Sequence, residues 1–594
     1  WGFDGVVVSD CGAINDFYEP GRHGVAADAP SAAALGVRSG TDVECGSVYR
    51  SLAESVRKGL IDEADIDRSV CRMLEGRFSV GDMDADSLVE WRSIPQSVIA
   101  CYAHKKLALQ MAREQMVLLK NNGVLPLAKD SRGLMLMGPN AADSTMQWGI
   151  YYGQPSHTVT ALEGIRAKVG DVPYLRGCGI TSMQVEESVF DRLHDVSGRP
   201  GMKACYWNNT NLEGPVAAEA SYTSALTLST GGNTVFAPGV NLNNFSVRMQ
   251  GTLVADRDED IEFIVRNDDR LRLIVDGDTL LNGWNSERHR HALRKSLTRG
   301  KSCDVVLEYM QYAEDALLNF DVVRRRDMSA DEVVDAAGDA EVVVFVGGIS
   351  PEYEREEAYV QEPGFDNGDR TSIELPEVQR NLLKALHEAG KRIVYVNCSG
   401  SAVALTPEAA ICDAIVQAWY PGEQGGHALA DVLFGDFNPQ GKLPVTFYRD
   451  DSQLPDFEDY RMEGRTYRYM RTTPLYPFGH GLSYTTYSYG KPAYADGRVS
   501  VEVSNTGAMA GTEVVQVYIR RPDDKSGPEK TLRGYATVSL EPGESRIVNI
   551  DMPRESFEVW DTENSRMDVL PGKYELMVGP SSREGDLRVI DVVL

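Results

Sequence analysis

Hydrophobic runs alternate with helical patterns over the first 85 residues. The apolar run Val6–Val8 is bounded by Gly and Ser, which predicts a short buried strand. Three helical patterns and one further short strand follow, near Ser31–Ser39, Ser47–Lys58, Asp62–Arg77 and Gly40–Cys45. Strands that alternate with helices are typical of a β/α barrel, but two such units cannot close a barrel of eight strands. We therefore predict that residues 1–85 form the C-terminal part of a (β/α)8 barrel.

A second α/β region begins after an irregular polar stretch, residues 86–102, which we predict to be a linker. An amphipathic helix is expected at His104–Leu119 and another at Glu377–Glu388. Four apolar strands are expected, at Gly133–Gly138, Val342–Val346, Arg392–Val396 and Ala414–Trp419. Strands of this kind, separated by helices, predict a doubly wound parallel layer. We assign this α/β sandwich domain to residues 103–200 and 326–450.

Two segments have an all-β pattern instead. Residues 201–325 are rich in Thr, Val, Asn and Gly and alternate with a period of two, which predicts a β-sandwich inserted into the α/β domain. Residues 451–483 are predicted to be a linker. Residues 484–594 contain closely spaced strands with Gly-containing turns, which predicts a β-sandwich of the fibronectin type III kind. The expected fold class is thus multidomain, α/β plus all-β.

Composition excludes several classes of function. The chain carries 60 Lys and Arg against 88 Asp and Glu, a net charge of -28, which disfavours binding to nucleic acid. It contains no apolar run of about 18 residues, so membrane insertion is not expected. Nine Cys without a CxxC pair indicate neither a zinc ribbon nor a thioredoxin-type site. Because the chain starts at Trp1 without a Met or a signal peptide, we expect the native N-terminus and any targeting sequence to lie upstream.

The first candidate for chemistry is Asp10, which directly follows the strand Val6–Val8. In a β/α barrel, catalytic groups project from the C-terminal ends of the strands. A carboxylate at that place can attack an electrophilic carbon or coordinate a metal. The alternative is an Asp that caps a helix or tightens a loop.

The second candidate is a Glu-rich loop, residues 351–357, which follows the strand Val342–Val346. Ligands bind at the carboxyl ends of strands in open α/β sheets. The loop contains Glu352, Glu354, Glu356 and Glu357, whose mutual repulsion could raise one pKa and so produce a general acid. A solvated acidic loop is the alternative.

Other side chains have two interpretations each. Arg370, preceded by Asp369, could hold a carboxylate in place or form a surface ion pair. Trp148 could stack on a sugar ring or pack against the core. Motifs of the types HExxH, GxSxG and Walker A are absent from the sequence, and its His residues lack the spacing of metal ligands.

Taken together, the motifs resemble glycoside hydrolase family 3, in that family's order along the chain. Gly2–Gly5 and Val8–Ala13 look like the strand that carries the family's nucleophile. The family's second domain and its junction to a fibronectin-like domain are resembled by Val117–Asn122, Leu125–Leu127, Met137–Asn140, Gln417–Gly426, Ala430–Gly435, Gly441–Pro444 and Tyr476–Tyr484. The resemblance runs from the first residues into the C-terminal domain.

This resemblance implies a retaining mechanism through a covalent glycosyl-enzyme. It assigns Asp10 as the nucleophile and places the acid/base on the Glu-rich loop, at Glu354, with Glu352 and Glu357 as rivals. Trp148, Asp369 and Arg370 are then expected to bind or support the substrate. No metal and no organic cofactor is implied.

The resemblance also bears on the substrate. Segments that look like the β-xylosidase branch are Asp10–Gly12, Thr41–Gly46, Met146–Gly149 and Pro155–Thr160. In that branch, Cys11 and Cys45 are expected to form a disulfide at the rim of the sugar pocket. The insert looks like a protective-antigen-type β-sandwich, which β-glucosidases also carry and which overhangs the active site. We expect an exo-acting β-D-xylosidase that releases terminal sugars from xylo-oligosaccharides, with β-glucosidase as the alternative.

One departure from the family is important. The first barrel strands of the family supply most of the residues that grip the terminal sugar, and this chain does not contain them. The chain by itself could therefore be inactive, or be a non-catalytic carbohydrate-binding fragment. The family's N-acetylglucosaminidases are a third option, which the complete second domain argues against. Expected partners are an oligosaccharide or an aryl glycoside, and a homo-oligomer is compatible with the sequence. The substrates of the family suggest a secreted or periplasmic location.

Overall fold

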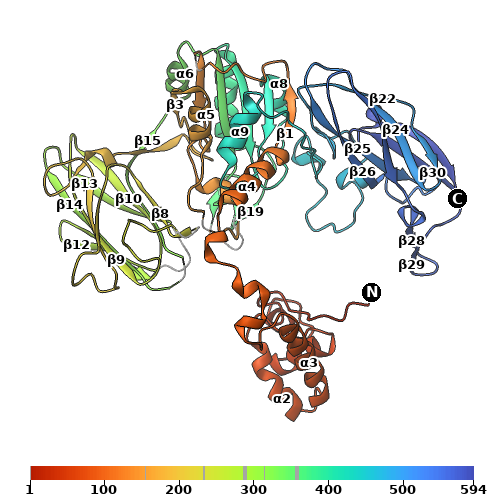
Figure 1. The fold of residues 1–594 in the computed structure, drawn as a ribbon, viewed down its shortest axis with the longest axis horizontal. Coiled ribbons are helices and arrows are strands. Elements are labelled where there is room, and N and C mark those ends of the chain that lie inside the picture. The colour runs from red at the N-terminus through yellow and green to blue at the C-terminus, as the bar shows by residue number, and fades with distance from the viewer. Residues whose placement is uncertain are drawn as a thin grey trace. The chain divides into compact units, whose positions relative to one another are not determined.

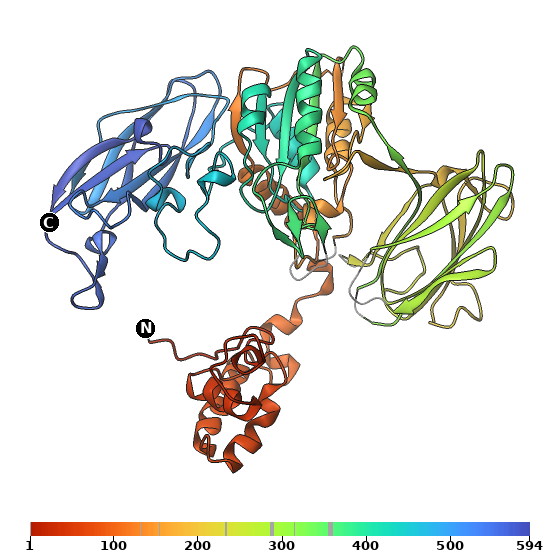
Figure 2. The same cartoon turned by 180° about the vertical axis from the view of Figure 1, so that it is seen from behind.

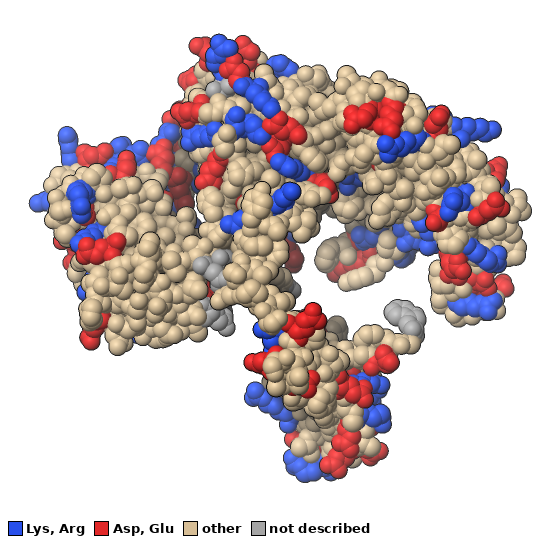
Figure 3. All heavy atoms as spheres, in the orientation of Figure 1, with Lys and Arg blue, Asp and Glu red and all other residues tan. Residues whose placement is uncertain are grey.

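The structure is a computed structural model that describes residues 2–130, 132–153, 155–231, 234–284, 290–313, 315–354 and 360–594. The chain divides into two units, Trp1–Val98 and Ile99–Leu594 (Figure 1). Within the described residues, no helix is both long and apolar enough to cross a membrane. On the side drawn in Figure 3, Lys and Arg side chains are interspersed with Asp and Glu.

The N-terminal unit is mainly helical. Its α-helices are α1 (Ala29–Arg38), α2 (Leu52–Arg57) and α3 (Glu63–Ser79), close to the predicted helices. Asp28 caps α1, because its side chain accepts a hydrogen bond of 2.9 Å from Ser31 N. Short 3-10 helices complete the unit, at Asn15–Phe17, Val48–Ser51, Asp86–Leu88, Glu90–Ser93 and Gln96–Val98.

The two strands expected in this unit are replaced by a single isolated β-bridge. Val6–Val8 was predicted to be buried, but Val8 is 58% exposed and forms one isolated parallel bridge, to Val43. Backbone hydrogen bonds from Ser9 N to Val43 O and from Val43 N to Val7 O support this bridge. An apolar run becomes a buried strand only where other strands and helices cover it. Among the described residues of this unit, only the segment around Val43 pairs with it.

The second unit begins with α4 (Tyr102–Gln115), which ends earlier than the helix predicted at His104–Leu119. The apolar residues that follow form β1 (Val117–Asn121) instead, because they pair antiparallel with β21. The sheet has the order β1-β21-β20-β16-β2-β3, and all neighbours except β1 run parallel. Its other strands are β2 (Leu134–Met137), β3 (Tyr174–Leu175), β16 (Val342–Gly348), β20 (Arg392–Cys398) and β21 (Ala414–Gln417).

Helices cover both faces of this sheet (Figures 1 and 2). Alternate residues of β16 enter two different hydrophobic clusters, with Val344 in one and Phe345 in the other. A strand buried on both faces needs a continuous apolar run, and the sequence shows such a run. The helices are α5 (Ala161–Val169), α6 (Ala330–Ala337), α7 (Glu377–Glu388), α8 (Thr406–Ile411) and α9 (Gly425–Leu433). Three two-residue strands lie between β16 and α7: β17 (Gln361–Glu362), β18 (Phe365–Asp366) and β19 (Asp369–Arg370).

The predicted insert is all-β and forms two sheets around one hydrophobic cluster. It starts earlier than the predicted boundary at residue 201, because β4 (Gln184–Ser188) pairs with β15 and β5 (Leu193–His194) pairs with β9. The polar sequence of β4 shows no clear alternation, so only its pairing reveals it. The remaining strands are β6 (Met202–Trp207), β7 (Ala218–Tyr222), β8 (Leu226–Ser229), β9 (Phe245–Val254), β10 (Glu259–Asp268), β11 (Arg270–Val275), β12 (Asp278–Trp284), β13 (Arg290–Leu297), β14 (Ser302–Gln311) and β15 (Leu317–Asp327).

The C-terminal region is also all-β, as predicted. Two four-stranded sheets, β22-β24-β23 with β27 and β26-β25-β30-β31, contribute to one core cluster. The preceding segment contains a 3-10 helix at Asp451–Gln453 and the short helix α10 (Thr466–Tyr469). The strands are β22 (Tyr487–Tyr489), β23 (Ala493–Ala495), β24 (Arg498–Asn505), β25 (Gly511–Arg520), β26 (Thr531–Leu540), β27 (Ser545–Asp551), β28 (Val559–Asp561), β29 (Arg566–Asp568), β30 (Lys573–Gly579) and β31 (Arg588–Val593).

Candidate active site

Asp10 lies at the exposed end of the bridge formed by Val8 and Val43. Its Oδ1 accepts a hydrogen bond of 2.8 Å from Cys11 N, which orients the carboxylate at the start of the following turn. The preceding residue is anchored, because Ser9 Oγ accepts from Cys45 N at 3.0 Å. The carboxylate is therefore open to solvent while the backbone beside it is held in place.

A disulfide joins Cys11 to Cys45, the pair that the family resemblance implied. The two Cα atoms are 4.4 Å apart, and the backbone adds a hydrogen bond of 2.8 Å from Gly12 N to Cys45 O. The turn after Asp10 is thus bonded, covalently and by hydrogen bonds, to the segment after Val43. This bonding limits the positions that the Asp10 carboxylate can take.

Two further carboxylates near Cys45 have structural partners. The Asp42 side chain is buried, accepts from Val7 N at 3.1 Å and lies 3.3 Å from Arg72 Nη1. Glu44 accepts hydrogen bonds from Val48 N and Tyr49 N at 2.9 and 2.6 Å. Their oxygens are already used in holding the unit together, which leaves Asp10 as the exposed carboxylate at this end of the bridge.

Glu354 lies in the loop after β16, at the carboxyl edge of the parallel sheet. Its Oε1 accepts from Ser401 Oγ at 2.8 Å, and its Oε2 accepts from the hydroxyl of Tyr420 at 2.7 Å and from Gly400 N at 3.3 Å. Gly400 and Ser401 follow β20, and Tyr420 follows β21, so the ends of three adjacent strands meet at one carboxylate. Burial, together with the Glu354 carboxylate, raises the pKa of Tyr420 well above its usual value, so its hydroxyl stays a donor.

Arg370 is connected to the same carboxylate through Ser401. Its Nη1 donates to Ser401 Oγ at 3.0 Å and to Ala402 O at 2.9 Å, and the same Ser401 hydroxyl donates to Glu354. Burial lowers the pKa of Arg370, although the nearby Glu354 opposes this effect. Its Nη2 is buried without a hydrogen-bond partner among the described residues. The positive charge of Arg370 therefore attracts the Glu354 carboxylate. Its hydrogen bond also holds the Ser401 hydroxyl that orients this carboxylate.

A buried polar network holds this part of the loop after β20. Asn397 Nδ2 donates to Ser399 Oγ at 3.1 Å and to Gln417 Oε1 at 2.6 Å. Ser399 Oγ in turn donates to Ser401 O at 2.7 Å. Buried amides and hydroxyls that satisfy one another fix a single backbone path. Little room remains there, since a Cβ at Gly400 would lie 3.0 Å from the Tyr420 ring and 3.4 Å from Glu354 Oε2.

Glu352, one of the two rivals of Glu354, has different contacts. Glu352 Oε1 lies 2.8 Å from Nη2 of Arg266, which is on β10 of the inserted β domain. Burial disfavours the charge of Arg266, but the attraction of Glu352 outweighs burial and raises the pKa of Arg266. Glu352 thus forms an ion pair between the loop and the insert. Glu357, the other rival, lies outside the described residues.

Trp148 and Asp369 have different surroundings. Trp148 is half-buried in the 3-10 helix Thr145–Trp148, donates from Nε1 to Thr158 Oγ1 at 2.7 Å and packs 4.8 Å from the ring of Tyr152. Asp369 is exposed and pairs through its backbone with Asp366 in the small sheet that contains β19. No direct contact between either residue and Glu354 is among the interactions of the described residues.

Sequence reasoning missed three residues of this cluster: Ser401, Tyr420 and Arg266. Tyr420 belongs to the segment Gln417–Gly426 that carried the family resemblance, so a signal for it existed. Ser401 and Arg266 had none, because their importance depends on which carboxylate they contact. Among the described residues, no group of three or more His, Cys, Asp or Glu side chains could hold a metal ion.

Known proteins match this chain over nearly its whole length. A family model described as the glycosyl hydrolase family 3 C-terminal domain matches residues 116–484, and one described as a fibronectin type III-like domain matches residues 513–582. A Xylanibacter ruminicola protein named xylan 1,4-beta-xylosidase is 44% identical over 607 residues, covering 100% of this chain and 70% of its own length.

More distant relatives have other names. A periplasmic beta-glucosidase of Salmonella typhimurium is 28% identical, over 98% of this chain and 62% of its own length. Among solved structures, a beta-glucosidase from Kluyveromyces marxianus in complex with glucose matches with a TM-score of 0.70 and 25% identity. That match covers 100% of this chain and 73% of the other. The chain therefore spans between 62% and 73% of the length of these three proteins.

Proposed function

Because the chain belongs to glycosyl hydrolase family 3, we propose that it carries the two catalytic carboxyl groups of a retaining, exo-acting β-glycosidase. Asp10 is the nucleophile and Glu354 is the acid/base. The observation that carries the second assignment is the position of Glu354, where three strand ends of the α/β sheet supply its hydrogen-bond donors.

The chemistry follows from these two roles. A retaining glycosidase needs two carboxyl groups about 5–5.5 Å apart. An Asp10 oxygen attacks the anomeric carbon while Glu354 gives its proton to the glycosidic oxygen, so the aglycone leaves as an alcohol and the sugar becomes an ester of Asp10. Glu354 then takes a proton from water, and the oxygen of that water displaces Asp10. Two inversions at the anomeric carbon leave its configuration unchanged.

Glu354 is preferred to its rival because of what each contacts. The hydrogen bonds to Glu354 come from a hydroxyl, a phenol and a backbone amide, and none of these three donors carries a formal charge. The charged Arg370 contacts the serine hydroxyl rather than Glu354 itself. Glu352 instead forms a direct ion pair with the buried guanidinium of Arg266, which ties it to the insert. A general acid must be free to reach the substrate, so a carboxyl group held by neutral donors is a better candidate than one engaged in an ion pair.

For the substrate, we favour the terminal β-D-xylosyl units of xylo-oligosaccharides. The relative named xylan 1,4-beta-xylosidase is 44% identical, whereas the relative named periplasmic beta-glucosidase is 28% identical. A β-glucosidase remains the alternative, supported by the solved structure with glucose. Trp148, Asp369 and Arg370 are the substrate-binding or supporting residues in this proposal.

The same proposal gives each region a role. Residues 1–85 supply the end of a (β/α)8 barrel, with the Cys11–Cys45 disulfide at the rim of its sugar pocket. The insert corresponds to a protective-antigen-type β-sandwich that limits the length of the aglycone. The ion pair from Arg266 to Glu352 supports this role, since it ties the insert to the loop that carries Glu354. A secreted or periplasmic location is proposed from the relative named as periplasmic.

The test uses the full chain and compares aryl β-D-xylosides with aryl β-D-glucosides. Asp10→Asn should lower kcat by about a thousandfold or more, as expected for loss of a nucleophile. Glu354→Gln should lower hydrolysis of xylobiose by about 10²–10⁴-fold. The same variant should keep the first step with a dinitrophenyl xyloside, the formation of the glycosyl-enzyme, because this leaving group needs no proton. Azide should accelerate turnover of this substrate and yield β-xylosyl azide, because azide needs no general base.

Matched variants separate the outcomes. Glu352→Gln, a change of the same kind two residues away, should show no azide effect. If Glu357→Gln gave the azide product and Glu354→Gln did not, the assignment of the acid/base would be wrong. A folded chain that binds xylose but turns over neither glycoside, with or without Asp10, would indicate a carbohydrate-binding fragment instead.

A further inference from the structure

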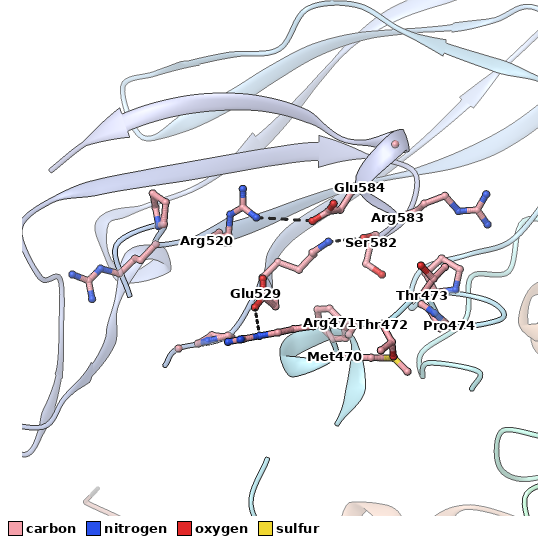
Figure 4. A pocket seen from close by; sticks show the side chains of 18 of the residues that line it. Met470, Arg471, Thr472, Thr473, Pro474, Arg520, Glu529, Ser582, Arg583 and Glu584 are labelled. Atoms are coloured by element: carbon pink, nitrogen blue, oxygen red, sulfur yellow. Dashed lines mark hydrogen bonds and ion pairs between the residues drawn. The ribbon is translucent and has the colours of Figure 1, made fainter. Parts of the chain in front are cut away.

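A pocket of about 1000 Å³, which Glu354 does not line, lies between the segment at residues 449–477 and loops of the C-terminal β domain. Figure 4 shows Met470 to Pro474 on one side, and Arg520 with Ser582, Arg583 and Glu584 on the other. None of the proposed catalytic or substrate-binding residues lines it. All of its lining residues belong to the described part of the chain.

The charge of this pocket is opposite to that of the chain. Seven Lys and Arg residues line it against three Asp and Glu residues, whereas the whole chain has a net charge of -28. A concave surface lined by one sign of charge concentrates the electric field and attracts counter-ions. The local excess of positive charge therefore favours an anionic ligand.

Part of this charge is already neutralised by ion pairs. Arg471 lies 3.0 Å from Glu529, and Arg520 contacts Glu575 at 2.6 Å and Glu584 at 4.0 Å. Two of these pairs are drawn in Figure 4. In such surface pairs the charge of the Arg is already balanced by a carboxylate. These Arg residues therefore line the pocket but add little attraction for an anionic ligand.

Three other cations have only backbone hydrogen-bond partners among the residues that the structure describes. Lys530 Nζ donates to Ser582 O at 2.9 Å, Lys525 Nζ to Pro522 O at 2.7 Å, and Arg449 Nε to Thr473 O at 2.9 Å. Within the described chain, no carboxylate lies within ion-pair distance of any of them. A carbonyl oxygen accepts a hydrogen bond but does not neutralise a full charge. Each of these cations keeps further donors for a ligand.

Lys530 is the most informative of the three, because it is only 6% exposed. Burial lowers the pKa of its ammonium group and Arg520 acts in the same direction, while Glu584 and Glu529 oppose them. Arg449 comes from the α/β side of the pocket, and Lys525 and Lys530 come from the connection between β25 and β26. A ligand that contacts all three would bridge both sides of the pocket.

We propose that this pocket binds an oxyanion, either the carboxylate of an acidic sugar or free phosphate. Charge-assisted hydrogen bonds from Lys and Arg are the strong interactions for such groups. Small-molecule sites have volumes of about 300–1000 Å³, so there is room for a sugar ring that carries the carboxylate. The site is separate from the glycosidase chemistry proposed above and does not depend on it.

The test titrates the full chain with D-glucuronate, inorganic phosphate and neutral D-glucose, by calorimetry at low and at high salt. The pocket variant is Arg449→Gln with Lys525→Gln. Its control is Arg498→Gln with Arg566→Gln, which removes the same charge from side chains that are 55% and 65% exposed and lie outside the pocket. Thermal melts establish that both variants fold.

We expect saturable, salt-sensitive binding of an anion, weakened about tenfold or more in the pocket variant and unchanged in the control. Binding of glucuronate identifies the carboxylate source, and binding of phosphate alone identifies the other. Turnover of aryl glycosides should be the same in both variants. The proposal is overturned if neither anion binds, if neutral glucose binds as tightly, or if the control weakens binding equally.

Discussion

The hydroxyl of Tyr420 donates a hydrogen bond of 2.7 Å to Oε2 of Glu354. These residues are 66 positions apart in the sequence and follow two different strands of the same parallel sheet. The contact joins the loop after β16 to the segment after β21. It also gives a simple way to test whether the orientation of Glu354 matters.

The first prediction concerns that hydrogen bond. Tyr420→Phe should lower kcat on xylobiose about 2- to 10-fold, because a net hydrogen bond contributes about 0.5–1.5 kcal/mol. KM should change little, since the acid/base acts mainly in the transition state. Tyr484→Phe is the matched control, because its hydroxyl donates at 2.7 Å to the carbonyl of Val432 instead. Equal losses of kcat in both variants would contradict a specific role for Tyr420.

The second prediction concerns the ion pair between Arg266 and Glu352. Glu352→Gln should lower the free energy of unfolding by about 1–2 kcal/mol, because a guanidinium that is 7% exposed loses its partner. This loss of stability is smaller than the usual cost of breaking a buried ion pair, because the Glu352 side chain is 36% exposed and water screens its charge. Urea unfolding measures this change.

A double variant makes this test sharper. Arg266→Met combined with Glu352→Gln should recover part of the lost stability, because no unpaired buried charge remains. Glu388→Gln is the control, since its pair with Lys384 is 64% and 67% exposed. Strict additivity of the two single changes would show that the pair contributes nothing.

The third prediction is a count of thiols. With the disulfide between Cys11 and Cys45 intact, denatured unreduced protein should titrate seven thiols: Cys71, Cys101, Cys178, Cys205, Cys303, Cys398 and Cys412. Reduction should raise the count to nine. Cys11→Ala with Cys45→Ala should lower the stability of the N-terminal unit by up to about 4 kcal/mol, the chain-entropy value for a loop of 34 residues. Nine thiols before reduction would exclude the disulfide.

The fourth prediction is a pH dependence that comes from His480. Burial lowers the pKa of this imidazole to about 4, and nearby Arg583 and Lys442 act in the same direction, while Asp586 and the hydrogen bond with Leu119 O oppose them. The unfolded value is 6.5, so between pH 6.5 and 4 the unfolded state binds the proton and the folded state does not. Stability is therefore complete above pH 6.5 and falls as the pH drops toward 4.

The contribution of His480 amounts to about 3 kcal/mol across that window. Unfolding of His480→Gln should depend less on pH than unfolding of the wild type. His387→Gln, a change of the same kind at the exposed end of α7, should keep the wild-type dependence. If the free energy of unfolding depended on pH in the same way in all three proteins, His480 would have the same pKa in the folded and the unfolded state.

Local patterns were sufficient for much of the fold. The helix Glu377–Glu388 has the predicted bounds, and the apolar runs at residues 342, 392 and 414 each begin a strand. These strands are buried on both faces along most of their length, so their sequences are mainly apolar, and that signal is visible without any tertiary information. The family resemblance, carried by short motifs, is confirmed by the family model over residues 116–484.

Patterns failed where structure depends on distant partners. The helix expected to reach Leu119 ends at Gln115, because the apolar residues after it pair with β21 about 300 positions later. Val6–Val8 has the composition of a core strand, yet burial requires neighbours that the described residues do not provide. β4 is polar, and only its pairing with β15 assigns it to the insert.

By itself, then, the sequence determined the family and placed a Glu-rich loop after a buried strand, while the domain bounds and the nucleophile at Asp10 stay predictions. Only the tertiary structure decided how the loop's glutamates differ. Glu352 meets a guanidinium from the insert, whereas Glu354 meets Ser401 and Tyr420 at the ends of the neighbouring strands. The physical reason is that a carboxylate's role depends on the charges and donors around it, and the order of strands in the sheet decides which of them come near.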